Sequence, residues 1–116
     1  MFIDEPQDAC IYEGNSALFR CTLAGATSTP FWKINGQIYS STRLPKNYEF
    51  NGTGLVVQNA DLSISNSTYS CLYYVDTSEG LVLQESAQAR LTVHSLDTAG
   101  IIMFKLLSIT IKLLCS

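Results

Sequence analysis

The side chains best suited to chemistry in this sequence are four cysteines and one histidine. The cysteines are Cys10, Cys21, Cys71 and Cys115, and the histidine is His94. No two cysteines form a Cys-x-x-Cys pair, and a single histidine cannot complete the ligand spacing of a zinc site. We therefore expect disulfide bonds or free thiols and no metal or other cofactor. His94 is expected to be a solvated side chain.

Motifs for catalysis are missing from the sequence. It has no glycine-rich phosphate loop, no nucleophile elbow, no paired histidines and no cluster of metal ligands. The carboxylates of Asp61, Asp76 and Glu79 are dispersed and have no partner in a recognisable pattern. These observations argue against an enzyme.

Charge and composition exclude two further classes of protein. Lys and Arg number 7 in a chain of 116 residues with a net charge of −3. They are spread singly, so no basic stripe is available for phosphates and nucleic acid is not an expected partner. Apolar residues make up 47% of the sequence, which is ordinary for a globular protein and argues against disorder. The length suits one domain.

Two sequons point to the secretory pathway. Asn51-Gly52-Thr53 and Asn66-Ser67-Thr68 predict glycosylation at Asn51 and Asn66, each in an exposed turn. Together with the cysteines they favour an oxidising, extracellular or cell-surface location.

The first residues do not fit a secretory signal. Met1 leads directly into Phe2-Ile3-Asp4-Glu5-Pro6, which has neither a basic start nor an apolar run. The expectation is that upstream sequence is missing here. The alternative is a cytosolic protein, whose cysteines would lack an oxidant.

Turn signals and alternation indicate the elements that position these residues. Short strand-like runs alternate with turns from residue 8 to 95, and no segment has a helical period. Asn35-Gly36 is a two-residue hairpin signal, and Asn51-Gly52-Thr53-Gly54 predicts another turn. Many short strands without helices predict an all-β sandwich or barrel. The expected strands are 9–12, 16–24, 31–34, 37–40, 55–57, 68–75 and 87–93.

Period-two alternation predicts which side chains face the core. In the run 16–24, Phe19 and Cys21 fall on one side, with Leu18 and Arg20 on the other. Both Cys21 and Cys71 face inward, as a bond between two sheets requires. The full inward set is Ala17, Phe19, Cys21, Leu23, Trp32, Ile34, Leu55, Val57, Tyr69, Cys71, Tyr73, Val75, Ala89, Leu91 and Val93.

The pattern over about residues 8–95 resembles the immunoglobulin superfamily. Trp32 follows Cys21, and Tyr69 lies two positions before Cys71. The resemblance implies a two-sheet antiparallel sandwich with an inter-sheet disulfide between Cys21 and Cys71. It also implies that Trp32 packs on the disulfide and that the Tyr69 hydroxyl bonds to backbone at the preceding turn. Domains of this kind mostly serve recognition or adhesion.

The sequence departs from the family pattern in two places. Ser65 and Ser67 stand where many members have Asp and Gly before the tyrosine. The usual Arg–Asp bridge is therefore not expected, although Arg43 or Asp61 could replace it. Residues 33–54 leave room for a C′ strand and little for a C″ strand, which favours an intermediate-type or shortened variable-type domain.

The chain divides into three segments. Residues 1–7 are an N-terminal extension or the start of the first strand, 8–95 form the immunoglobulin-like domain, and 96–116 are an apolar tail outside it. Lys105 and Lys112 interrupt the apolar run that starts at residue 99. A marginal membrane anchor, an amphipathic surface helix and non-native sequence remain open for the tail.

The role of the first cysteine is also open. Cys10 lies between Ala9 and Ile11, which favours a buried small side chain. Pairing with Cys115 and an intermolecular link are the alternatives.

We expect the binding surface on the sheet face opposite the core. An apolar and aromatic patch with a polar rim suits contact with a protein partner or with a second copy of the chain. Cover by the tail, by a neighbouring domain or by a loop at residues 80–83 is the alternative. Extracellular recognition or adhesion is thus the predicted function, and a spacer domain of a larger ectodomain is the second hypothesis. The expected surface residues are Phe31, Lys33, Leu72, Tyr74, Gln88 and Arg90.

Overall fold

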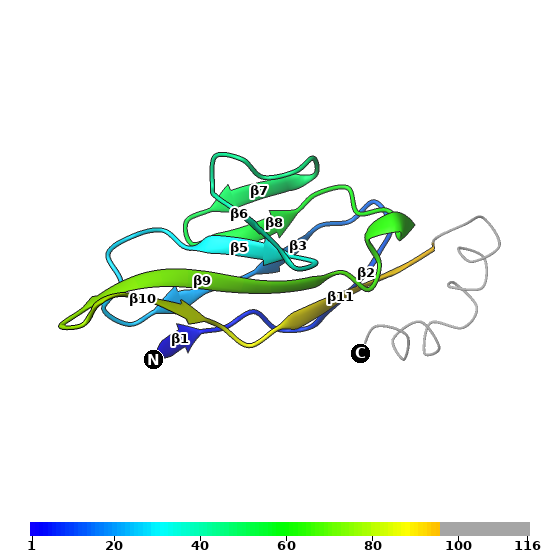
Figure 1. Ribbon diagram of the computed structural model, residues 1–116. Helices are drawn as coiled ribbons and strands as arrows, with labels where there is room; N and C mark the ends of the chain where they lie inside the picture. The colour runs from blue at the N-terminus through cyan, green and yellow to red at the C-terminus, as the bar shows by residue number, and fades with distance from the viewer. Residues whose placement is uncertain (96–116) are drawn as a thin grey trace.

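Two β-sheets face each other in the computed structural model, which describes residues 1–95 (Figure 1). The tail at 96–116, with Cys115 and the expectation of a membrane anchor, lies outside the described residues. Up to residue 95, none of the helical structure is long and apolar enough to cross a bilayer.

The larger sheet has the strand order β2-β11-β9-β5-β6, with β10 paired to β9. Every pair in it is antiparallel except β2 with β11, which run parallel. Its strands are β2 (Ala9–Tyr12), β5 (Phe31–Ile34), β6 (Gln37–Tyr39), β9 (Thr68–Thr77), β10 (Gly80–Glu85) and β11 (Ala89–His94).

The opposite sheet has the order β3-β8-β7, and β1 pairs with β4 beside it. The predicted strand 16–24 is divided into β3 and β4. Between β6 and β7 the structure has no strand, as expected for a domain without C″. The elements are β1 (Phe2–Asp4), β3 (Ala17–Phe19), β4 (Thr22–Leu23), β7 (Tyr48–Asn51), β8 (Gly54–Val57) and the short 3₁₀ helix η1 (Leu62–Ile64).

The first residues pass from one sheet to the other. β1 pairs with β4, whereas β2 pairs with β11. Buried Pro6 lies at the crossing, between β1 and β2. Proline has no backbone N–H, and no inter-strand hydrogen bond is lost there because the strand pairing is interrupted. The Ala87 amide donates to the Glu5 carboxylate at 3.3 Å, and the Arg90 amide donates to Asp8 at 2.8 Å. These bonds hold the crossing segment against the larger sheet.

The core lies between the sheets and follows the predicted alternation. Alternate residues of β5 and β11 are buried, as are the inward residues of β9. Ala17 and Val75, at the ends of the inward set, are half-buried. Burial of apolar area on this scale is the main stabilising term of such a domain. The buried hydrophobic residues of the core are Phe19, Cys21, Leu23, Trp32, Ile34, Leu55, Val57, Ala60, Tyr69, Cys71, Tyr73, Ala89, Leu91 and Val93.

One predicted loop is a strand. The segment from residue 80 pairs with β9 along its whole length, so the two strands form a long hairpin that projects from the sandwich (Figure 1). Gly80 has a φ of 108°, which favours glycine at the tight turn. The Thr77 hydroxyl donates to the Gly80 carbonyl at 2.7 Å and accepts from the Glu79 amide at 3.2 Å. The expectation of a loop at 80–83 was wrong.

Candidate recognition surface

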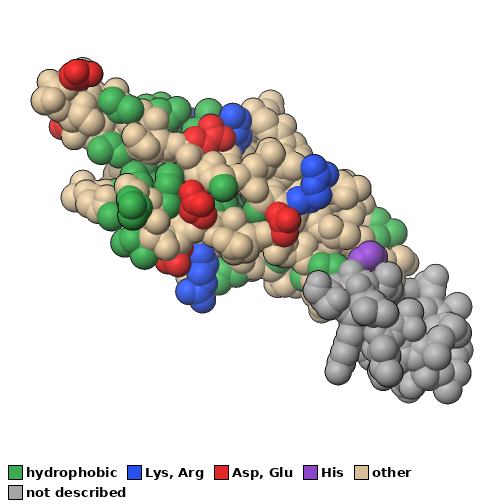
Figure 2. Space-filling view, turned by 90° about the horizontal axis from the view of Figure 1, so that it is seen from below, with side chains coloured by type: hydrophobic (Ala, Val, Ile, Leu, Met, Phe, Trp, Pro, Cys, Tyr) green, Lys and Arg blue, Asp and Glu red, His purple; other side chains and the backbone are tan. Residues whose placement is uncertain are grey.

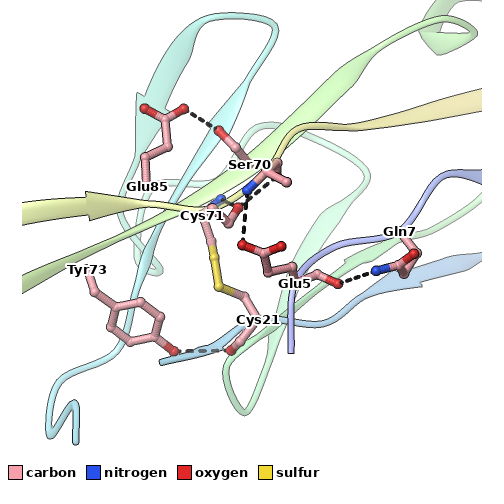
Figure 3. The surroundings of a disulfide bond; sticks show 9 residues. Glu5, Gln7, Cys21, Ser70, Cys71, Tyr73 and Glu85 are labelled. Carbon is pink, nitrogen blue, oxygen red and sulfur yellow. Dashed lines mark hydrogen bonds between the residues drawn. A yellow bond between two sulfur atoms is a disulfide. The ribbon is translucent and has the colours of Figure 1, made fainter. Parts of the chain in front are cut away.

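The disulfide joins the two sheets at the centre of the core. Cys21 and Cys71 are bonded, with their Cα atoms 6.4 Å apart, so the pairing implied by the resemblance is confirmed. The Tyr73 hydroxyl donates to the Cys21 carbonyl at 3.1 Å (Figure 3). The Cys71 amide donates to the Ser86 hydroxyl at 3.0 Å. The bridge thus ties β9 to the opposite sheet and fixes the base of the projecting hairpin.

Two other side chains singled out from the sequence have different surroundings from those expected. Cys10 is half-buried rather than buried, and it is not a free thiol. His94 is also half-buried, and its ring centroid lies 5.9 Å from that of Tyr12.

Trp32 is fully buried beside the disulfide. On the β5–β9 ladder it is the residue directly opposite Cys71, and both face the core. Its indole N–H has no hydrogen-bond partner among the described residues. Packing, rather than hydrogen bonding, is therefore its contribution to the fold.

The Tyr69 hydroxyl bonds to a side chain rather than to backbone, in contrast to the expected corner. It shares a hydrogen bond of 2.7 Å with the hydroxyl of Tyr48, which comes from β7 in the opposite sheet. The ring of Tyr69 stacks on Phe19, with centroids 4.5 Å apart. Burial raises the pKa of Tyr69 and also that of Tyr48, which keeps both hydroxyls protonated. The pair links the sheets, and the hydrogen bond gives the hydroxyl of buried Tyr69 a partner in half-buried Tyr48.

No Arg–Asp bridge occurs within the part of the chain that the structure describes. Arg43 is exposed, and Asp61 caps η1 by accepting from the Ser63 amide at 2.9 Å. Hydrogen bonds from the Ser63 hydroxyl and amide lower the pKa of Asp61. The Asn35 side chain instead ties the β5–β6 turn to β9, donating to Ser67 at 3.1 Å and accepting from the Thr68 amide at 3.0 Å.

Tyr48→Phe is expected to lower the free energy of unfolding by about 1–3 kcal/mol, because it leaves the Tyr69 hydroxyl buried without this partner. Urea denaturation would measure the change. Tyr39→Phe is the matched control, since its hydroxyl bonds to Gln37 at an exposed site and its loss should cost little. Equal effects for Tyr48→Phe and Tyr39→Phe would contradict a structural role for the tyrosine pair.

Leu72 was expected on the binding surface, and this prediction was wrong. It faces away from the core, but only 1% of its area is exposed. Phe31 and Glu85 lie directly opposite it on the two neighbouring strands. Lys33 on β5 pairs with Glu85 on β10 at 3.5 Å, so the ion pair spans β9 beside Leu72. Because β10 is a strand, Leu72 occupies the centre of a three-stranded face and is covered by its neighbours.

An exposed apolar cluster remains on the same face, toward the tip of the hairpin. Tyr74 is 50% exposed, Leu81 70% and Leu83 44%, and Tyr74 lies directly opposite Leu83. The half-buried ring of Phe31 meets Tyr74 edge-on, with centroids 5.7 Å apart. We name these four residues, Phe31, Tyr74, Leu81 and Leu83, the outer patch. Figure 2 shows hydrophobic side chains gathered at the end of the molecule where the hairpin projects.

Gln88 and Arg90 are exposed, but the structure does not bring them to the outer patch. Arg90 lies opposite Thr68 at the start of β9, six residues before Tyr74. Six residues of an extended strand span about 20 Å. Both side chains instead line a small polar hollow with Asp8 and Thr68. The expected surface therefore extended too far along the sheet, because it included Gln88 and Arg90.

An open groove of about 550 Å³ adjoins the outer patch, between the loop after β4 and the hairpin. Its lining has one carboxylate, Asp76, and neither histidine nor cysteine, and no group of His, Cys, Asp or Glu among the described residues could hold a metal ion there. Sequence reasoning did not find it because its walls are far apart in the chain. The lining residues are Gly25, Ala26, Thr27, Ser28, Thr29, Phe31, Tyr74, Val75, Asp76 and Leu81.

The two sequon asparagines lie at the surface. Asn51 is the exposed last residue of β7, next to a turn. Asn66 is exposed between η1 and β9 and has a φ of 70°, a conformation that asparagine adopts more readily than most residues.

Comparison with known proteins identifies the fold. No model of a protein family matches the sequence, and no curated protein matches it. The crystal structure of Duf (Kirre) D1 has a TM-score of 0.69 at 19% identity, over 84% of this chain and 98% of that chain. The Ig-like domain of human leucine-rich repeat-containing protein 4 has a TM-score of 0.62 at 26% identity, over 84% and 89%.

A two-domain structure gives the same result. The N-terminal Ig1-2 module of the Drosophila receptor protein tyrosine phosphatase DLAR has a TM-score of 0.63 at 22% identity, and the match covers 84% of this chain. The match covers 50% of the length of that module. The chain therefore has the immunoglobulin-superfamily fold.

Proposed function

We propose that this immunoglobulin domain is an extracellular recognition or adhesion module that binds a protein partner, or a second copy of itself, through the outer patch. The observation that carries the proposal is the exposure of Tyr74, Leu81 and Leu83 side by side on one face of a sheet. Monomeric proteins rarely leave large contiguous apolar patches in water, and such patches with polar rims are typical of interaction sites.

The surroundings of Tyr74 favour binding over mere exposure. Its ring is held edge-on by Phe31, so fixing it in a complex would cost little conformational entropy. Tyrosine is enriched among residues that dominate interface energies. The ion pair of Lys33 with Glu85 stands beside the patch, and Asp76 lines the adjoining groove. These charges would favour partners that carry complementary charges at the facing positions.

Tyr74→Ala should weaken self-association or partner binding by about tenfold or more, since truncation of an interface hot spot costs ~2 kcal/mol. Sedimentation and cell-aggregation assays would measure binding. The free energy of unfolding should fall by only about 1 kcal/mol, the usual contribution of an aromatic pair.

Leu18→Ala is the matched control, because Leu18 is also an exposed apolar strand residue but lies on β3 in the opposite sheet. Unchanged binding of folded Tyr74→Ala would move the binding site elsewhere. A large fall in its melting temperature would show that Tyr74 serves the fold.

An extracellular location is supported by the inter-sheet disulfide and by the surface positions of both sequons. Expression in a eukaryotic secretory host with a supplied signal peptide should add glycan mass at Asn51, Asn66 or both. Thr53→Ala and Thr68→Ala should remove the shift site by site and spare the positive φ of Asn66. Normal secretion without any mass shift would contradict the glycosylation proposal.

A spacer domain is the second candidate, and the tandem structures favour it. The match covers 48% of a structure of tandem Ig repeats of Dlar and 20% of a structure of Sidekick-1 immunoglobulin domains 1-5. A spacer would bind nothing through Tyr74. The full-length transcript would help to decide, since a spacer should have further domains on both sides.

A further inference from the structure

The hairpin strand β10 presents a free edge. It pairs with β9 along one side, and within residues 1–95 no strand pairs with its other side (Figure 1). All six of its residues are exposed. A free strand edge of this kind can accept another strand through its backbone.

The hydrogen-bond pattern shows which backbone groups lie at that edge. The Ser86 amide donates to the Cys71 carbonyl at 2.9 Å, and the same antiparallel register continues along β10. In such a ladder alternate residues turn their N–H and C=O groups toward the partner strand and away from it. Counting from Ser86, the groups of Leu81, Leu83 and Glu85 point away from β9.

This edge lacks the usual protection against strand addition. Natural edge strands are blunted by lysine, proline, bulges or a covering segment. β10 reads Gly-Leu-Val-Leu-Gln-Glu, and its register with β9 has no irregularity. Its one charge, Glu85, already contacts Lys33 at 3.5 Å and Ser70 at 2.8 Å. No uncompensated charge therefore opposes a second strand.

We propose that two copies of this chain join β10 to β10 in antiparallel orientation, which makes one continuous sheet. The proposal rests on the proposed function and deepens it, because it names a second copy as the partner and the β10 backbone as the binding element. The two-fold axis would place Leu83 opposite Leu83 and Leu81 opposite Glu85. The two Glu85 residues then lie at opposite ends of the pair, so no like charges face each other. The two outer patches would become neighbours on one surface.

Leu83→Pro and Leu83→Ala, each in the full 116-residue chain, separate edge pairing from contact through side chains. Proline removes an outward N–H that the fold does not use, whereas alanine keeps it. Sedimentation equilibrium should show self-association weakened by about tenfold or more for proline and by much less for alanine. Equal weakening would overturn edge pairing and leave the outer patch as the contact. A wild-type chain that stays monomeric would overturn it too, while binding of another partner would still be tested by Tyr74→Ala.

Cysteine cross-linking gives a second test that does not depend on folding of the proline variant. Across the proposed axis two copies of residue 83 would have Cα atoms about 5.5 Å apart, within disulfide range. Leu83→Cys should therefore form a disulfide-linked dimer, whereas Gln84→Cys, which would face Val82 of the other copy, should not. Both variants carry the same C-terminal segment, so any association through it affects them alike. Equal cross-linking at the two positions, or none at residue 83, would contradict the pairing.

Discussion

Replacing both Cys21 and Cys71 by alanine is expected to lower the free energy of unfolding by about 2–5 kcal/mol. The bridge closes a loop with a sequence separation of 50, which is worth about 4 kcal/mol on the chain-entropy model. Both sulfur atoms are fully buried, so alanine also leaves unfilled space in the core. Urea denaturation of the oxidised protein and of the variant would measure the difference.

The redox state of the secreted protein is the control for this prediction. Non-reducing peptide mapping should recover the peptides of Cys21 and Cys71 joined to each other. Wild type that is reduced while unfolded and refolded with its thiols kept reduced should show most of the loss seen in the variant, because both sulfur atoms are buried in the folded protein. Recovery of both cysteines as free thiols after secretion would contradict the extracellular location.

Trp32→Ala is expected to cost about 3–5 kcal/mol, the range for removing a large aromatic side chain from a core. Trp32→Phe should cost less, because the indole N–H makes no hydrogen bond with the described residues and none is lost. Denaturant midpoints would give both values. Ile38→Ala is the control, since Ile38 is exposed on the adjacent strand β6 and should change stability by about 0.5 kcal/mol or less. Similar losses for Trp32→Ala and Ile38→Ala would contradict the packing described for Trp32.

The core was predictable because its signal is local. Alternation places Phe19, Cys21 and Leu23 on one side of a strand whatever its neighbours are. The same alternation around Cys71, with Trp32 and Tyr69 at their positions, was enough to identify the sandwich. The inward facing of Cys21 and Cys71 needed only a strand and its direction of burial, whereas their pairing was implied by the resemblance to the immunoglobulin superfamily.

The outer face was less predictable because burial there depends on which strands lie beside each residue. Leu72 is covered only because β10 continues the sheet, and residues 81–83 are apolar without alternation, which hides the strand. The partner of Tyr69 depends on Tyr48 in the other sheet. Alternation along one strand does not show which residue of a distant strand lies beside a given side chain.

The break between β10 and β11 also made the predicted surface wrong, because it separates Arg90 from the outer patch. The Ser86 hydroxyl accepts from the Cys71 amide and donates to the Ala87 carbonyl at 2.9 Å, at the point where the two strands separate. Arg90 comes after this break. It lies opposite Thr68 at the start of β9, far from Tyr74.

Hydroxyl-radical footprinting of the chain displayed on adhering and on dispersed cells would locate the binding surface directly. If the chain binds through the outer patch, adhesion should protect the side chains of Tyr74, Leu81 and Leu83 from oxidation. Leu18 and Leu62, which are exposed but lie outside the outer patch, should be oxidised equally in both states. Protection of Leu18 or Leu62, with Tyr74, Leu81 and Leu83 unchanged, would show that the chain binds through another surface.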